Sequence, residues 1–455
     1  MAGKPAPPAT RPRVAAPTVV LVTIDTLRAD RVGCYGRADA GTPALDALAA
    51  GGVRFTNAQT TAPLTLPAHA SILSGRTVPA HGVRNNGTFM LPPDVPVVAD
   101  AFQHAGYATG AFVSSPVLAF RHGLARGFQA YDDDIPRPRH RQGLVLFYDE
   151  RAGTDTATHA AIWLAQQGAK PAFLWVHFWE PHAPYRPPPE FARRFADRYQ
   201  GEVAAADAAL AQLLTQIRDL GREQVLVVVS GDHGEGLGEH GEPTHGVYLY
   251  RATMRVPLVI NGRHLGIRPA VVDQPVSLAD IAPTLLDLAG LPPLAGADGA
   301  SLAAGLTGKG GWPVRAGVFA ESHLPQIEFG WSGLRAMVTP LWKVIDAPRP
   351  ELYRLPADVE EKHDLAATRR SDVDATRATL TELVRRAAAS APSVAADRSA
   401  SASELETLRS LGYAASGRRV AAKRLVEPAA VDPKDRAEFL KQHDRATMMV
   451  EEGQV

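Results

Sequence analysis

The sequence predicts a doubly wound α/β fold, in which a mostly parallel sheet carries helices on both faces, followed by a small antiparallel subdomain. Two observations support the main sheet. Short apolar, β-branched runs alternate with amphipathic helical segments through the first 310 residues, and polar residues cluster directly behind several of the runs. A third observation supports the subdomain: beyond Gly310 the pattern changes to short strand-like pieces separated by turns.

The run "TVVLVTI" at 18–24 is typical of a strand buried on both faces of a parallel sheet. The segments behind it keep the alternation of strand and helix. In order, we expect a helix at 42–52, a strand at 53–60, a helix at 155–168, a strand at 172–179, a helix at 201–221 and a strand at 224–230.

The C-terminal part begins with strand-like pieces at 318–322, 334–340, 341–348 and 351–355, and a helix rich in Ala and Arg follows at 372–389. The stretch "SAPSVAADRSAS" has the composition of a linker. Ser403 and Glu406 could form a capping box for a short helix behind it, and the chain ends with an amphipathic helix. We therefore divide the chain into a flexible leader (1–17), a catalytic α/β domain (18–310), a small subdomain of the same fold (311–390) and a linker with a helical tail (391–455).

The composition is that of an ordinary globular protein, with 455 residues, 45% hydrophobic and 21% charged. The 48 basic and 48 acidic residues cancel, which gives no support for nucleic-acid binding or for docking on an anionic membrane. The single cysteine, Cys34, excludes an internal disulfide framework and a Cys-rich metal site, and we interpret it as a packing residue.

The N-terminal "MAGKPAPPATRPRVAAP" is rich in proline and has no apolar core, so it does not have the pattern of a signal peptide. No window approaches the roughly 18 apolar residues of a transmembrane helix. We expect a soluble protein, cytoplasmic as the sequence stands and periplasmic or secreted if a signal or anchor once preceded this leader.

The segment "VLVVVSGDHGEGLGEHGEPTHG" carries the strongest chemical signal. An apolar strand delivers Asp232 and His233 side by side into a glycine-rich loop, and Glu235, Glu239, His240 and His245 follow. Carboxylate oxygen and imidazole nitrogen are common ligands of zinc and manganese. A polar surface loop is the alternative, which we prefer for any lone histidine here but not for the pair at the strand end.

Asp25 follows the first predicted strand, and a polar cluster at 177–182 follows another. In open α/β sheets, ligands bind beyond the carboxyl ends of the strands, so these clusters predict one shared site. Asp25 could instead cap a helix, but two glycines in the next segment weaken that interpretation.

Thr65 lies in "TTAPLTLPAHASILSGR", bracketed by Pro63 and Pro67 and followed by a predicted helix that Gly75 ends. Backbone N–H groups at the start of a helix favour an anionic substrate group or an alkoxide. Taken alone, Thr65 is better explained as a helix N-cap than as a nucleophile. A hydroxyl becomes a good nucleophile only when a metal or a base lowers its pKa.

Several segments resemble the sulfatase family of the alkaline phosphatase superfamily. "IDTLRADRVGCYG" and "GDHGEGLGEHG" resemble its metal-binding motifs, and "TLPAHASILSG" its nucleophile helix. "HGVRNNG", "WEPHAPYRPP", "YRATMRVPLVI", "VSLADIAPTLLDLAGLP" and "ELYRLPADVEEKHDLA" resemble further family segments in the family's order. The resemblance implies the family's α/β fold and an ester hydrolase that uses a divalent metal.

Residue by residue, the resemblance implies that Asp25, Asp232, His233 and Thr65 hold the metal and that Thr65 is also the nucleophile. His182 and His245 would hold the transferred group or protonate the leaving group. A second metal, if one is bound, would use Glu180, His182 and His245. We expect one or two ions, Zn²⁺ or Mn²⁺ in preference to Ca²⁺. The substrate would be a small anionic ester, contacted by His69, Arg84, Asn86, His182 and His245.

The sequence departs from the family pattern at three positions. Thr26 replaces a second Asp, Thr65 replaces the Cys or Ser that sulfatases oxidise to formylglycine, and His69 replaces an Arg. Since threonine cannot form that aldehyde, the resemblance to Thr-nucleophile phosphodiesterases of the superfamily favours phosphate esters, namely phosphodiesters, phosphonate monoesters or phosphomonoesters, with sulfate esters as promiscuous substrates.

Three alternatives remain open. They are a sulfatase that works without formylglycine, a phosphoglycerol- or phosphoethanolamine-type transferase, and a binding module on a decayed hydrolase frame. The intact set of Asp25, Thr65, Asp232 and His233 argues against the third. The final helix also resembles the first helix of a tetratricopeptide unit, which cannot bury its apolar face alone.

Overall fold

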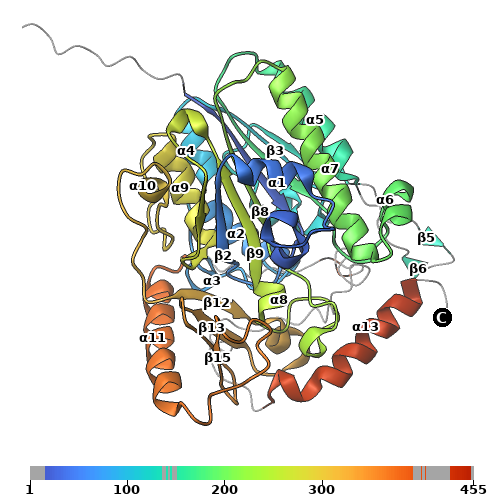
Figure 1. Cartoon of the computed structure of the whole chain (residues 1–455), viewed down its shortest axis with the longest axis vertical. Helices are drawn as coiled ribbons and strands as arrows, with labels where there is room; N and C mark the ends of the chain where they lie inside the picture. The colour runs from blue at the N-terminus through green and yellow to red at the C-terminus, as the bar shows by residue number, and fades with distance from the viewer. Residues whose placement is uncertain are drawn as a thin grey trace, which may run out of the picture.

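The computed structural model describes residues 16–135, 140–141, 144–145, 151–392, 401, 405 and 431–451. A nine-stranded sheet forms the centre (Figure 1). Every neighbouring pair in it is parallel except the two pairs made by β9, so the predicted mostly parallel sheet is confirmed. In spatial order the strands are β10 (Ala270–Val272), β2 (Val53–Gln59), β9 (Arg255–Asn261), β8 (Val225–Gly231), β1 (Thr18–Ile24), β7 (Ala172–Phe178), β3 (Ala108–Phe112) and β4 (Ala130–Asp132), with β11 (Val276–Ser277) beside β2.

Helices cover both faces of this sheet, because side chains alternate along each central strand. On β1, Val19 and Leu21 enter one buried core, while Val20 and Val22 enter the other. The first core is closed by α2 (Thr65–Ser74), α4 (Val98–His104) and α9 (Ile281–Leu288), and the second by α1 (Pro43–Ala50), α5 (Gly153–Gln166) and α7 (Arg198–Asp219). The result is the three-layer, doubly wound architecture that the sequence predicts.

Several predicted elements agree with the structure to within a few residues. β1 has the predicted bounds, and α1, β2, β7 and β8 lie where expected. Helix α7 starts before the predicted position, since the Asp197 side chain accepts a hydrogen bond from the Gln200 backbone N–H (3.4 Å) and caps it.

The predicted C-terminal subdomain is a separate four-stranded antiparallel sheet with one long helix against it (Figure 1). Its backbone joins the main fold where Glu321 N–H donates to the Thr61 carbonyl (3.0 Å), shortly before α2. The elements are β12 (Val318–Ser322), β13 (Leu334–Val338), β14 (Trp342–Asp346), β15 (Glu351–Arg354) and α11 (Arg370–Ala389). Shorter elements are α3 (Val78–His81), β5 (His140–Arg141), β6 (Leu144–Val145), α6 (Pro189–Arg194), α8 (Arg251–Met254) and α10 (Ala303–Leu306).

The expected terminal helix is α13 (Ala437–Glu451), drawn in red in Figure 1. Leu440 reaches the main apolar core, and Tyr248 Oη donates to the Pro433 carbonyl just before the helix (3.0 Å). The helix therefore packs on the catalytic fold. The capping box expected at Ser403 and Glu406 lies outside the described residues. Among the helices that the structure describes, none has the length and apolar character of a membrane span.

Candidate active site

The candidate site lies at the carboxyl ends of three neighbouring strands, as the sequence predicts. β1 runs between β7 and β8 and pairs with both in parallel, so Ile24 faces Phe178 on one side and Gly231 on the other. This register brings Asp25, at the end of β1, next to Asp232, directly behind β8. His177, one residue before the end of β7, comes close to both, and all three side chains are fully buried.

Thr65 completes a compact set of donor atoms with Asp25, Asp232 and His233. Its Oγ1 lies 3.3 Å from His233 Nε2 and 3.5 Å from Asp25 Oδ1. His233 Nε2 lies 3.6 Å from Asp25 Oδ1 and 3.6 Å from Asp232 Oδ2. Ligands about 2.0–2.2 Å from one tetrahedral ion are about 3.3–3.6 Å apart, so the four atoms have the spacing of a single coordination shell. We call these four residues the metal cage.

The electrostatics of the cage call for a cation. Burial raises the pKa of Asp25 to about 7, and burial together with the neighbouring Asp25 charge raises the pKa of Asp232 to about 7. The Oδ2 atoms of both carboxylates are buried without a hydrogen-bond partner among the described residues. Unpaired buried carboxylate oxygens are costly, and a divalent ion would satisfy them. The residues therefore fit the metal that the sequence implies.

Neighbouring groups orient the cage. Asp232 Oδ1 accepts hydrogen bonds from the backbone N–H groups of Thr26 (3.1 Å) and His233 (2.7 Å). His233 Nδ1 lies 2.9 Å from the Gly234 carbonyl, so it carries the proton and leaves Nε2 free to bind a metal. Tyr199 Oη donates to the Thr26 carbonyl (2.7 Å) and helps hold Thr26 at φ 51°, an unusual conformation for a β-branched residue.

Two further histidines stand beside the cage. His245 Nδ1 lies 3.1 Å from Glu235 Oε1. The centre of the His245 ring lies 4.5 Å from the centre of the His233 ring and 5.2 Å from the centre of the His182 ring. Burial lowers the pKa of both His245 and His182, so both rings are neutral at neutral pH. Sequence reasoning named Glu235 only as a neighbour of the metal motif, and the structure makes it the partner that orients His245.

The other predicted site residues have different surroundings. Asn86 Oδ1 accepts a hydrogen bond from Leu66 N–H at the start of α2 (2.9 Å), and its buried Nδ2 has no partner among the described residues. Arg84 Nε donates to the buried Glu321 carboxylate (3.2 Å). Glu180 Oε1 accepts from Gly153 N–H at the start of α5 (2.9 Å), and its buried Oε2 has no hydrogen-bond partner among the described residues.

A model of the sulfatase family matches residues 17–291. The chain belongs to the sulfatase family. It is 27% identical to an ulvan-active sulfatase of Formosa agariphila over 63% of this chain and 64% of that protein, which is less than two thirds of the relative's length. It is 24% identical to a Δ4,5-hexuronate-2-O-sulfatase of Bacteroides thetaiotaomicron over 77% of this chain and 84% of that protein.

Among solved structures, the phosphonate monoester hydrolase of Agrobacterium radiobacter has the same fold, with a TM-score of 0.68 and 24% identity over 82% of this chain and 95% of that one. Membership of the sulfatase family makes this chain an ester hydrolase of a metal-dependent family. The proteins similar to this chain include both sulfatases and a phosphonate monoester hydrolase, so the comparisons leave open whether its substrate is a sulfate or a phosphorus ester.

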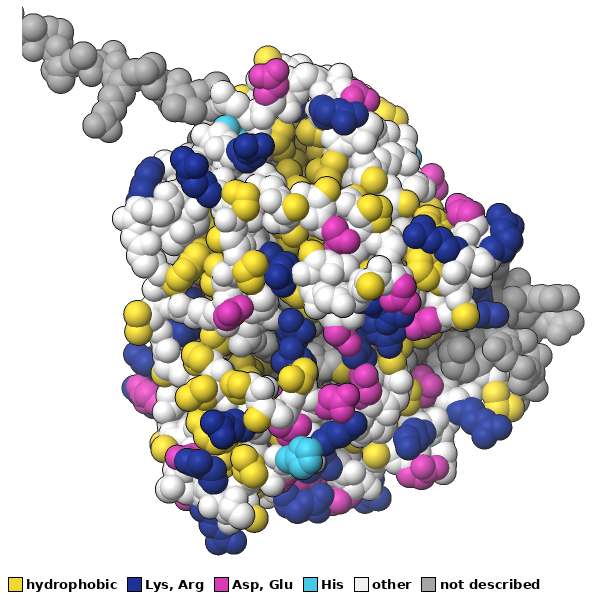
Figure 2. All heavy atoms as spheres, in the orientation of Figure 1, with side chains coloured by type: hydrophobic (Ala, Val, Ile, Leu, Met, Phe, Trp, Pro, Cys, Tyr) yellow, Lys and Arg dark blue, Asp and Glu magenta, His cyan; other side chains and the backbone are white. Residues whose placement is uncertain are grey.

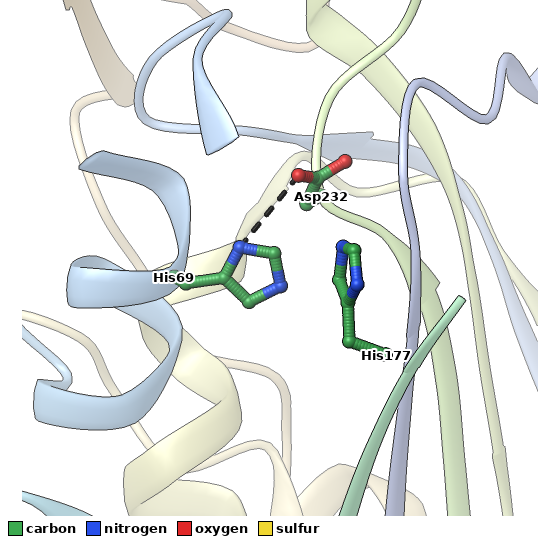
Figure 3. Close-up of side chains that lie close together, drawn as sticks. All are labelled: His69, His177 and Asp232. Carbon is green, nitrogen blue, oxygen red and sulfur yellow. Dashed lines mark ion pairs between the residues drawn. The ribbon is translucent and has the colours of Figure 1, made fainter. Parts of the chain in front are cut away.

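His69, where the sulfatase pattern has an arginine, is fully enclosed. Figure 3 shows His69, His177 and Asp232 facing one another, as three potential ligands of a second ion. However, His69 Nδ1 lies 2.7 Å from the Thr65 carbonyl and Nε2 lies 2.9 Å from Thr23 Oγ1, so both nitrogens are used within the protein. This geometry supports neither metal binding nor the predicted substrate contact of His69. The two contacts of the His69 ring instead hold the first turn of α2, on which Thr65 lies, against β1.

His177 is the residue of the site to which sequence reasoning gave no role of its own. Its Nε2 lies 3.4 Å from Asp25 Oδ2, and neither ring nitrogen has a hydrogen-bond partner among the described residues. Only the order of the strands reveals this proximity, because His177 and Asp25 are brought together by the pairing of β7 with β1. His177 therefore lies beside the Asp25 carboxylate without a hydrogen bond to it.

Proposed function

We propose that this protein is a metal-dependent hydrolase that cleaves phosphate esters through a covalent intermediate on Thr65. The substrates would be phosphodiesters, phosphonate monoesters or phosphomonoesters. The observation that carries the proposal is the position of the Thr65 hydroxyl, 3.3 Å from His233 Nε2 and 3.5 Å from Asp25 Oδ1, on the first residue of α2. The hydroxyl is thus both a donor atom of the metal cage and the group best placed to attack.

The identity of the nucleophile favours phosphorus over sulfur. A threonine cannot be oxidised to the aldehyde by which sulfatases release sulfate, and Cys34 lies in a short 3₁₀ turn whose contacts are with Asp46. A phosphorylated threonine can instead be released by attack of water at phosphorus. The departure at this one position therefore changes the expected substrate while the fold stays that of the family.

Each residue has a role in the proposed reaction. A Zn²⁺ or Mn²⁺ ion held by Asp25, Thr65, Asp232 and His233 would lower the pKa of the Thr65 hydroxyl and neutralise charge on the transferred group. The imidazole of His233 favours these ions over Ca²⁺, which takes oxygen ligands. The unpartnered Asn86 Nδ2, fixed at the start of α2, is available to donate a hydrogen bond to a phosphoryl oxygen.

Protons balance through the buried histidines. Thr65 Oγ1 forms a bond to phosphorus as the ester oxygen leaves, so one proton must pass from the hydroxyl to the leaving group. His245, neutral and hydrogen-bonded to Glu235 through Nδ1, can accept that proton at Nε2 and return it, with His182 as the alternative carrier. In the second step, His245 accepts a proton from a water molecule, which attacks phosphorus and breaks the bond between phosphorus and the Thr65 oxygen. The proton then returns to the Thr65 oxygen.

A second candidate is sulfate ester hydrolysis without formylglycine, which is favoured by the names of the relatives that match the sequence. A transferase would share the first step and differ only in the acceptor, an alcohol in place of water. These functions are separated by which ester is cleaved fastest and by what accepts the group on Thr65.

The test compares rates on p-nitrophenyl phosphate, bis-p-nitrophenyl phosphate, p-nitrophenyl phenylphosphonate and p-nitrophenyl sulfate, with enzyme loaded with Zn²⁺ or Mn²⁺. We expect a phosphorus ester to be fastest, and we expect Thr65→Ala to lower its kcat/KM by at least 1,000-fold because it removes the nucleophile. Thr60→Ala is the matched control, since Thr60 is equally buried and its hydroxyl bonds only the Ala62 carbonyl (3.0 Å).

Rapid acid quenching followed by peptide mass analysis should find the phosphoryl group on Thr65. If the sulfate ester is fastest, the second candidate replaces the first. If Thr65→Ala retains its rate, Thr65 is not the nucleophile. Addition of glycerol as acceptor tests transfer: a glycerol phosphoester as the main product, in place of free phosphate, would identify a transferase.

A further inference from the structure

A cavity of about 600 Å³ lies beside α8, separate from the metal cage. None of the four cage residues lines it, so it is not part of the proposed active site. Its volume lies in the range of small-molecule sites. Four separate chain segments build its wall, contributing Arg28, Asp30, Glu239, His240, Arg251, Ala252, Arg255, Val359, Glu360 and Lys362.

Arg251 is the unusual member of this wall. Its backbone N–H donates to Glu361 (2.7 Å), but its guanidinium makes no hydrogen bond or ion pair with any residue that the structure describes. Arg255 follows four positions later, where its Nε donates to the Thr56 carbonyl (2.7 Å) and its guanidinium packs over the Tyr35 ring (5.6 Å). Two guanidinium groups thus line one cavity with most of their donors unused.

The acidic side chains of the wall already have partners. Arg28 contacts both Asp30 and Glu239 through its two terminal nitrogens, and Lys362 pairs with Glu360. Four cationic and three anionic side chains line the cavity, with His240 taken as neutral, which leaves one excess positive charge. No described carboxylate pairs with Arg251 or Arg255.

The charge of Arg251 also disfavours the charged form of Arg255. Burial lowers the pKa of Arg251, and burial together with the Arg251 charge lowers the pKa of Arg255 to about 10. Cationic groups in a partly desolvated cavity are stabilised by an anion. A planar guanidinium with free donors matches the geometry of phosphate, sulfate or carboxylate oxygens.

We propose that this cavity binds a small molecule carrying a tetrahedral oxyanion, a phosphate or sulfate group, with Arg251 and Arg255 as its main contacts. Figure 2 shows Lys and Arg side chains mixed with Asp and Glu side chains over the middle of the molecule, where Figure 1 places α8. The proposal does not depend on the reaction proposed for Thr65. Arg28 connects the cavity with the candidate active site, because its Nη1 also donates to the Glu235 backbone carbonyl (3.1 Å), and the Glu235 side chain contacts His245.

The test is titration calorimetry of the metal-loaded protein with sodium sulfate and with sodium phosphate, at constant ionic strength kept with sodium chloride. We expect Arg251→Ala to weaken the binding of both ions at this site at least ten-fold. Arg251→Lys should restore only part of the affinity, because it keeps the charge and loses the planar fork. Arg268→Ala is the matched control, an exposed arginine at the opposite end of the sheet, and should change binding less than two-fold.

Because the active site would also bind these ions, a residue-resolved readout is needed. Phenylglyoxal modifies free guanidinium groups, and mass analysis should show Arg251 modified in chloride and protected in sulfate. Tighter binding of glucose 6-phosphate than of phosphate would assign the cavity to an organic ester, and equal binding would assign it to the free ion. The proposal is overturned if Arg251→Ala binds sulfate as the unmodified protein does, or if sulfate leaves the modification of Arg251 unchanged.

Discussion

Substitution of Arg84 tests whether this residue contacts the substrate or stabilises the buried Glu321 carboxylate. The family resemblance gives Arg84 a contact with substrate, whereas the structure directs its Nε to Glu321 Oε1 at 3.2 Å. Glu321 is only 2% exposed, and His323 (3.6 Å) and Arg335 (4.0 Å) also face its carboxylate. We therefore expect Arg84→Ala to destabilise the fold by weakening the compensation of a buried charge.

The size of the effect follows from the pKa of Glu321. Burial alone would raise this pKa, but the charges of His323, Arg84 and Arg335 outweigh it and lower the pKa from 4.5 to about 2. Since each pKa unit corresponds to about 1.4 kcal/mol, the ionised carboxylate contributes about 3 kcal/mol to folding above pH 4.5. Arg84 is one of three residues that lower this pKa, so its removal should cost about 1–2 kcal/mol at pH 7.

The sign of the pH dependence is fixed by the direction of the shift. A carboxylate with a lowered pKa in the folded state stabilises the protein above its unfolded pKa, and this stability is lost as the pH falls from 4.5 towards 2. Arg84→Ala raises the pKa of Glu321 in the folded protein. The variant should therefore lose less stability than the unmodified protein between pH 5 and pH 3.

Urea unfolding at pH 7, 5 and 3 measures these differences, and Arg385→Ala on exposed α11 serves as the control for loss of one surface arginine. A double-mutant cycle with Glu321→Gln isolates the pair, for which we expect a coupling energy of about 1 kcal/mol or more. If Arg84→Ala leaves stability unchanged at every pH while raising KM strongly, Arg84 serves the substrate and the structural role is wrong.

Two further predictions concern a buried ion pair and the metal. Lys343 is only 1% exposed and donates to Glu361 (2.9 Å). Lys343→Met should leave the Glu361 carboxylate uncompensated and lower the free energy of unfolding, measured with urea, by about 3 kcal/mol. An unchanged urea midpoint would contradict this prediction. Chelation with EDTA should abolish activity and lower the melting temperature, because a bound ion stabilises the folded state, and Zn²⁺ or Mn²⁺ should restore both better than Ca²⁺.

The fold could be predicted where the sequence carries a local signal. The run of β1 and the helix ends at Gly51 and Gly75 mark their elements directly. β3, "ATGAF", escapes notice because small residues give it no apolar run, and Gly110 is needed where a side chain would meet the Trp163 ring. The antiparallel direction of β9 is equally invisible, because a buried strand has the same composition in either direction.

The candidate site could be predicted as far as the strand ends could be aligned. Asp25 and Asp232 lie 207 positions apart in the sequence, yet both directly follow strands of one parallel sheet, so a general rule brings them together. No such rule pairs Arg84 with Glu321, which are 237 positions apart, because Arg84 lies in a loop and Glu321 lies on β12. The enclosure of His69 depends equally on the surrounding packing.

The charge of the site narrows the expected substrate further. The metal cage holds two carboxylates, so one divalent ion would leave it neutral, and burial keeps His182 and His245 neutral beside it. Among the described residues, no Lys or Arg side chain forms a hydrogen bond or ion pair with Thr65, and Arg84 is held by Glu321. A dianionic phosphomonoester would find no second positive charge there, whereas a phosphodiester or phosphonate monoester carries a single negative charge. With one ion bound, the monoanionic phosphorus esters should therefore be the better substrates, and a preference for the phosphomonoester would instead point to a second cation at the site.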